Sequence, residues 1–252
     1  MAITGPAELL AVWEAGLDRS GAGRALLLHR TARPEAGDEE LLSVPVGERE
    51  ADLFALRRTL FGERMQVLVE CEPCGEAMEF DLDADGLAAQ RPREEGPLRV
   101  TEGDWNVEFR LPTVADLTAA AEAAVPGTDG PSARSLLIAR CLASAERAGR
   151  PVPAGRLPDE LPETVLRRVA EAAERADPAA DVTLKVSCPE CGGTTRAELD
   201  IASYLWSELD AWARDLLLDV HLLAAAYGWT EPEILALSPL RRRYYLELCA
   251  DA

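Results

Sequence analysis

Two pairs of cysteines carry the clearest chemical signal in this 252-residue sequence. Cys71 and Cys74 lie in VECEPCGEAMEFDLD, and Cys188 and Cys191 lie in VSCPECGGTTRAELD. The two segments align as an internal repeat, with a glycine directly after the second cysteine of each pair. Such a glycine lets the backbone turn its amides toward the thiolates, and two pairs supply the four sulfur ligands of a tetrahedral zinc site. We therefore expect one structural Zn²⁺ bound by all four cysteines.

The distance between the pairs along the chain is no obstacle to a shared site. From Cys74 to Cys188 there are 114 positions (188 − 74). Closing such a loop costs on the order of 4 kcal/mol more than closing the shortest loop. A structural zinc ion contributes roughly 10–16 kcal/mol in small peptides. The segment from about 113 to 177 is then an insertion between two halves of a zinc ribbon.

Other uses of these cysteines remain open. A thioredoxin-type pair lies at a helix N-terminus after a strand, whereas each pair here is flanked by apparent strands on both sides. A disulfide needs an oxidising compartment, which nothing in the sequence indicates. Thiols packed without metal, or two separate sites with other ligands, are further alternatives. We expect His29 and His221, the only histidines, to cap or pack within helices, and Cys141 and Cys249 to be buried as small apolar residues.

The spacing of apolar residues predicts an α+β fold that is mostly helical, with the zinc ribbon assembled from two distant β-hairpins. A helix is expected over 133–149, a loop over 84–97 and a linker over 124–132. Thr113 with Asp116, and Thr230 with Glu233, have capping-box spacing, and Ser238 before Pro239 is typical of a helix start. A hairpin is expected around Glu102 and Gly103. One apolar stripe is expected along the late long helix, formed by Leu205, Leu209, Trp212, Leu216 and Val220. The expected parts are an N-terminal helical segment (1–64), the first knuckle with β-hairpins (65–112), a helical insertion (113–180), the second knuckle (181–200), and a long helix with short helices (201–252).

Composition and missing motifs argue against several classes of protein. The formal net charge of −19 disfavours binding to nucleic acid. We recognise no secretion signal and no membrane span, so a cytoplasmic protein without membrane contact is expected. No nucleotide-binding loop, HExxH or GxSxG motif is present, and four thiolates would leave a zinc ion no open position. We therefore expect no enzyme and no small-molecule substrate.

Several segments together resemble the baseplate hub assembly chaperone family of contractile phage tails, related to proteins of extracellular contractile injection systems. They are LLAVWEAGL, the two CxxCG knuckles, VEFRLPTVADL and the tail HLLAAAYGWTEPEILALSPLRRRYYL. The resemblance implies a non-enzymatic assembly factor, or a minor component, that binds baseplate or hub proteins. It also implies that Cys71, Cys74, Cys188 and Cys191 are the metal ligands. The candidate partner-binding residues are Tyr227, Trp229, Ile234, Leu237, Arg241 and Arg242.

Two other functions compete with this interpretation. A zinc-ribbon adaptor in transcription or another cytoplasmic complex would need basic residues around its knuckles to touch nucleic acid. The knuckles carry glutamates instead: Glu70, Glu72, Glu76, Glu79 and Glu190. A thiol oxidoreductase would tolerate loss of a single cysteine, whereas a zinc site predicts that Cys188→Ser destabilises the chain.

Overall fold

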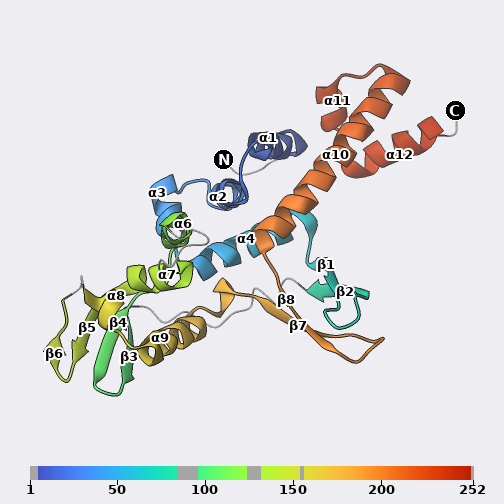
Figure 1. Ribbon diagram of the computed structural model, residues 1–252. Helices are drawn as coiled ribbons and strands as arrows, with labels where there is room; N and C mark the ends of the chain where they lie inside the picture. Colours follow the sequence, from blue (N-terminus) through green and yellow to red (C-terminus); the bar gives the residue numbers. More distant parts are fainter. Residues whose placement is uncertain (1–4, 84–95, 124–131, 154–155, 251–252) are drawn as a thin grey trace. The chain divides into compact units, whose positions relative to one another are not determined.

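Helices and small antiparallel sheets make up the described part of the chain, as expected for an α+β protein (Figure 1). The computed structural model describes residues 5–83, 96–123, 132–153 and 156–250. They fall into two compact units. We call Met1–Pro34 with Ala202–Ala252 the end unit, and Glu35–Ile201 the central unit. Nearly all of the expected loop at 84–97 and linker at 124–132 lies outside the described residues.

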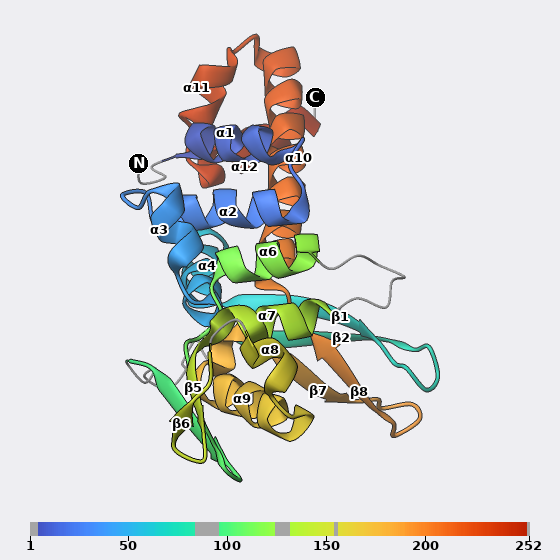
Figure 2. The ribbon, with the colours of Figure 1, turned by 60° about the vertical axis from the view of Figure 1, so that its left-hand side comes forward.

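The end unit consists of helices from both ends of the chain. Figure 2 shows α1 and α2 side by side across the long helix α10. Leu10 of α1 packs with Ala213 and Leu216 of α10, and Trp13 Nε1 donates a 2.8 Å hydrogen bond to Asp210. The apolar spacing predicted for α10 therefore forms the core of this unit. Its helices are α1 (Pro6–Gly16), α2 (Gly21–Ala32), α10 (Ile201–Tyr227), α11 (Glu231–Leu235) and α12 (Pro239–Ala250).

The central unit contains two separate hairpins and a four-stranded sheet. The hairpins are β1 (Arg64–Glu70) with β2 (Ala77–Asp83), and β7 (Thr183–Ser187) with β8 (Thr194–Glu198). The sheet has the order β3-β4-β5-β6, with bounds Leu98–Glu102, Trp105–Phe109, Leu142–Arg147 and Arg150–Pro151. Its helices are α3 (Asp38–Ser43), α4 (Val46–Phe61), α6 (Val114–Ala123), α7 (Ala133–Cys141), α8 (Leu157–Glu160) and α9 (Glu163–Ala176).

An apolar core lies between the four-stranded sheet and α9. Trp105, Val107 and Phe109 alternate along β4 and pack with Val165 and Val169 of α9. The period of two in the strand and of four in the helix places these side chains on facing surfaces. The predicted hairpin around Glu102 and Gly103 is confirmed, with Glu102 paired to Trp105.

The predicted helix over 133–149 is wrong beyond Cys141, so the 113–180 segment is not entirely helical. Residues Leu142–Arg147 form β5 and pair with β4 along its free edge. Ala148 and Gly149 both have positive φ, 49° and 73°, as a two-residue type I′ hairpin turn requires. Pairing with β4 and burial of Ala145 outweigh the helix propensity of this stretch.

Three predicted helix caps are confirmed. The hydroxyl and the backbone N–H of Thr230 both donate to Glu233, each over 2.8 Å. The hydroxyl of Thr113 donates to Asp116 in the same way, and Ser238 Oγ accepts from the N–H of Arg241. Among the described residues, none of the helices has the length and apolar character needed to cross a bilayer.

Candidate metal centre

The two cysteine turns have the same backbone structure. In the first, the N–H of Cys71 donates to the carbonyl of Glu76 (2.8 Å), and Gly75 donates back to Cys71 (2.7 Å). In the second, Cys188 donates to Gly193 (2.8 Å), and Gly192 donates back to Cys188 (3.0 Å). The internal repeat seen in the sequence is thus a repeat of structure.

The glycine after each pair has the backbone conformation that the turn needs. Gly75 and Gly192 have φ of 75° and 70°, in the left-handed region that favours glycine. The next amide, that of Gly193, points at Cys191 Sγ over 3.4 Å. A backbone N–H directed at sulfur stabilises a thiolate, so the turn at Gly192 has the effect on Cys191 that the sequence predicts.

The four sulfur atoms lie together although they come from two distant hairpins. All four ligand atoms are within 4.8 Å of one another. Cys71 Sγ is 3.7 Å from Cys191 Sγ, and Cys74 Sγ is 3.8 Å from Cys188 Sγ. Each of these short distances joins one hairpin to the other. A tetrahedral zinc site with Zn–S bonds of about 2.3 Å has sulfur–sulfur edges of about 3.8 Å, so the donor set fits a zinc ion.

The thiols are free and differ in environment. The sulfur separations far exceed the roughly 2.05 Å of a disulfide bond, and none of the six cysteines is disulfide-bonded. Cys71 and Cys188 are buried, whereas Cys74 and Cys191 are exposed. The centre therefore has one buried and one exposed sulfur from each hairpin.

Hydrogen bonding separates the acidities of two of these thiols. A hydrogen bond from the backbone of Cys191 is the main cause that lowers the pKa of Cys188 to about 7. At Cys74, the backbone hydrogen bond from Glu76 lowers the pKa, but the neighbouring sulfurs outweigh it and raise the pKa to about 12. A divalent cation that binds thiols must displace their protons, so its binding here would be stronger at higher pH.

The hairpins also contact each other beyond the cysteines. The N–H of Glu72 donates a 3.1 Å hydrogen bond to the hydroxyl of Thr195, which is itself buried. A side chain at Gly193 would come within 2.8 Å of Pro73. A small apolar cluster joins both hairpins and consists of Val69, Cys71, Met78 and Cys188, with Phe80, Val186 and Ala197 at its edge. These contacts place the two pairs in register.

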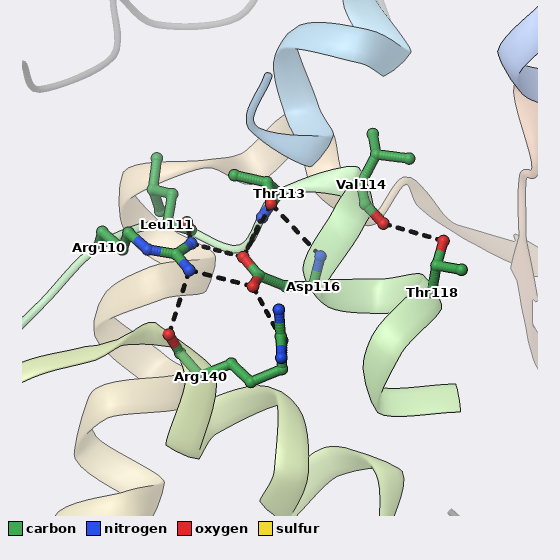
Figure 3. Close-up of polar contacts among 7 residues, drawn as sticks. All are labelled: Arg110, Leu111, Thr113, Val114, Asp116, Thr118 and Arg140. Atoms are coloured by element: carbon green, nitrogen blue, oxygen red, sulfur yellow. Dashed lines mark hydrogen bonds and ion pairs between the residues drawn. The ribbon is translucent and has the colours of Figure 1, made fainter. Parts of the chain in front are cut away.

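A second polar cluster lies in the same unit, around the buried carboxylate of Asp116 (Figure 3). Arg110 pairs with both carboxylate oxygens, and Arg140 Nε donates to Oδ1 over 3.0 Å. Burial alone would raise the pKa of Asp116, but the hydrogen bonds from Arg110 and Thr113 hold it well below the usual range. The capping-box spacing predicted the contact with Thr113, whereas no sequence pattern identified the two arginines.

The six candidate partner-binding residues lie in different environments. Tyr227 and Trp229 stack with ring centroids 4.6 Å apart, and Tyr245 meets both edge-on. Ile234 is fully buried, and Arg242 is buried with Nε 3.2 Å from Asp219 Oδ2. Leu237 is partly buried, and Arg241 is exposed. Ile234 and Arg242 therefore serve the packing of α11 and α12, and neither offers an accessible surface.

Comparison with known protein families identifies a match that covers the whole of the central unit. The sequence profile described as T4 bacteriophage base plate protein matches residues 28–203, well over half of the chain. This chain belongs to the T4 bacteriophage base plate protein family. The matched range includes both cysteine pairs and ends near the start of α10, so the whole of the tail that resembled an assembly chaperone lies beyond it. No curated protein and no solved structure matches this base plate family member.

Proposed function

We propose that this chain is a non-enzymatic assembly factor, or a minor structural component, of the baseplate or hub of a phage-like contractile tail or injection system. Membership of the base plate family carries the proposal, since it covers both hairpins and the sheet between them. Its partners are other baseplate or hub proteins. Assembly takes place in the cytoplasm of the host cell, where such particles are built.

We also propose that one structural zinc ion joins the two cysteine hairpins into a zinc ribbon. The support is the convergence of four sulfurs with the edge lengths of a tetrahedral site. Four thiolates leave the metal no position for water or substrate, so its contribution is to folding. The ribbon holds the segments before and after the 113–180 segment in a fixed relation.

The role in assembly is tested by deleting the gene from a phage or particle-producing strain and imaging the products. We expect free tubes or incomplete baseplates, and recovery when the gene is supplied in trans. Mass spectrometry of complete particles then separates the two forms of the proposal, since an assembly factor is absent from them and a component is present. Normal baseplates in the deletion strain would refute both forms.

The metal is tested by elemental analysis of full-length protein purified under reducing conditions without chelator. We expect one zinc per chain and four thiols that react only after unfolding. Metal-free protein with rapidly titrating, reversibly oxidised thiols would instead favour a thiol oxidoreductase, for which the lowered pKa of Cys188 would be the relevant feature.

A further inference from the structure

Exposed apolar side chains are concentrated near the end of the described chain. Of the nine large hydrophobic side chains that the described residues expose, seven lie between Leu217 and Leu248. The three most exposed of the seven are on α12: Leu240, Tyr244 and Leu248, with 60–65% of their surface accessible. Exposed apolar surface gathered in one place marks sites of interaction more often than scattered single residues do.

The three side chains form one stripe along α12. Their spacing of four residues places them on the same face of the helix, over a length of about 12 Å. We call Leu240, Tyr244 and Leu248 the α12 stripe. A stripe of this kind is what one helix offers to another when they pack lengthwise.

The opposite side of α12 is already fixed within the end unit. Arg242 pairs with Asp219 of α10, and Tyr245 contacts Tyr227 and Trp229 edge-on. Ser238 caps the first turn of the helix. Because these contacts fix α12 on the side opposite the stripe, the helix is already formed before a partner binds. Binding would therefore cost little free energy for ordering α12.

The charges beside the stripe indicate what kind of partner fits. Arg242 is paired with Asp219, and Arg243 with Glu247 of its own helix. Arg241 is exposed, lies one turn before Tyr244, and makes no ion pair among the residues that the structure describes. A chain with net charge −19 thus places an unpaired positive charge at the edge of its exposed apolar stripe.

We propose that the α12 stripe docks an amphipathic helix of another baseplate protein, whose apolar face covers Leu240, Tyr244 and Leu248 and whose carboxylates face Arg241. This inference rests on the proposed function. A second copy of the chain fits less well, because each copy would bring the same positive Arg241 to the contact. The repulsion between this acidic chain and an acidic helix is largely screened beyond about 8 Å at physiological salt, so the local contact decides.

The test uses the full chain and two labelled peptides in fluorescence anisotropy. Each peptide is an amphipathic helix of about five turns with a leucine face. One has glutamates and the other has lysines beside that face. We expect the glutamate peptide to bind wild-type protein at least about tenfold more tightly than the lysine peptide. We expect Tyr244→Ser with Leu248→Ser to weaken binding by a similar factor, and Arg241→Glu to reverse the preference between the peptides.

Matched variants control for general effects on charge and hydrophobicity. Leu68→Ser removes an exposed leucine from β1, and Arg134→Glu reverses an exposed arginine on α7. Neither should alter binding of either peptide. Circular dichroism and thermal melts of every variant establish that it is folded, which is expected because all these positions are exposed.

Several results would overturn the inference. If both peptides bind equally well, or if neither binds, the partner is not an acidic amphipathic helix. A dimer in sedimentation velocity that Tyr244→Ser dissolves would assign the stripe to a second copy. Binding to phosphatidylglycerol vesicles that the same variants abolish would assign it to a membrane. If gene deletion blocks baseplate assembly while the stripe variants restore it fully, the proposed function stands and the docking surface is wrong.

Discussion

The backbone N–H of Gly47 donates a buried hydrogen bond of 2.9 Å to Oδ2 of Asp177, across 130 positions of the chain. Gly47 lies in the first turn of α4, where the N-cap residue Pro45 provides no side-chain cap. Asp177 therefore supplies the missing acceptor from a distance, at a helix end that favours negative charge. It also fixes the point where the chain returns from the sheet and α9.

This contact changes the loop that a metal would have to close. From Gly47 the chain runs through α4 and β1 to Cys71, and from Asp177 it runs through β7 to Cys188. The hydrogen bond between Gly47 and Asp177 holds the starting points of these two routes together. It therefore already closes most of the long loop between the cysteine pairs. Closure entropy rises with loop length, so the cost to the metal is smaller than the sequence separation suggested.

The first prediction concerns this contact. A Cβ on Gly47 would lie 1.8 Å from Asp177 Oδ1, which is a steric clash. Gly47→Ala should therefore reduce the free energy of unfolding of the central unit by about 1–3 kcal/mol. In an Asp177→Ala background the same change should cost much less, because the clashing atom is gone. Urea unfolding of the four members of this double-mutant cycle measures the coupling, and additive effects would contradict a direct contact.

The second prediction concerns the metal centre. Cys188→Ser should abolish zinc binding and lower the melting temperature by well over ten degrees, since structural zinc stabilises folding by several kcal/mol. Chelator should have the same effect on wild-type protein, and no further effect on the variant. Cys141→Ala is the matched control, because Cys141 is also buried but lies outside the cluster. If Cys188→Ser and Cys141→Ala had the same melting temperature, the cysteine cluster would not stabilise the fold through a metal ion.

The third prediction concerns Asp116. Asp116→Asn should cost roughly 1–3 kcal/mol at pH 7, less than for a fully buried pair, because the Arg110 and Arg140 side chains are 48% and 46% exposed. The pKa of Asp116 is lowered by folding, so its contribution is complete above the ordinary carboxyl pKa near 4 and is lost as the pH falls below it. The difference between wild type and variant should therefore shrink toward pH 3, as measured by urea unfolding. A difference independent of pH would refute the assignment.

The fourth prediction separates two neighbouring arginines. Arg242→Glu would place a second carboxylate beside Asp219, whose pKa is raised chiefly by burial and only partly lowered by Arg242. We expect a loss of roughly 2–4 kcal/mol in the stability of the end unit. Arg241→Glu, at an exposed position, should change stability by less than about 0.5 kcal/mol. Tryptophan fluorescence during urea unfolding reports mainly on this unit, because it holds four of the five tryptophans and only Trp105 lies in the central unit. Equal effects of the two substitutions would contradict the burial of Arg242.

Exchanging the charges provides a further check on this pair. Arg242→Glu combined with Asp219→Arg should recover part of the lost stability, because the pair is restored in reverse orientation. No recovery would mean that packing around the Arg242 side chain, and not its charge, is what the end unit requires.

The local parts of this structure were predictable from the sequence. The Cys-x-x-Cys-Gly repeat predicted two equivalent turns, and the capping residues Thr113, Thr230 and Ser238 predicted where helices begin. In each case the interacting groups are within a few residues of each other, so their spacing determines the contact. The convergence of Cys71 with Cys191 was also predicted, because each repeated Cys-x-x-Cys-Gly segment supplies half of a four-sulfur site.

What escaped prediction depends on contacts between distant segments. The stretch after Cys141 has helix-forming residues, and only the free edge of β4 makes it a strand. Asp177 and Arg140 acquire their roles from partners 130 and 24 positions away, and no periodicity marks them. Arg242 lies in a run of three arginines, and sequence alone does not say which of the three faces inward.

The end unit is built from segments that the ribosome makes at very different times. Its helices α1 and α2 leave the ribosome well before α10, which begins at Ile201 and against which Leu10 packs. At bacterial rates of about 5–20 residues per second, α1 and α2 wait roughly 10–40 seconds for their partner. The central unit, which ends at Ile201, is complete by then. Leu10, buried against α10 in the finished protein, lacks that partner until α10 has been made, so this apolar helix is open to aggregation during synthesis.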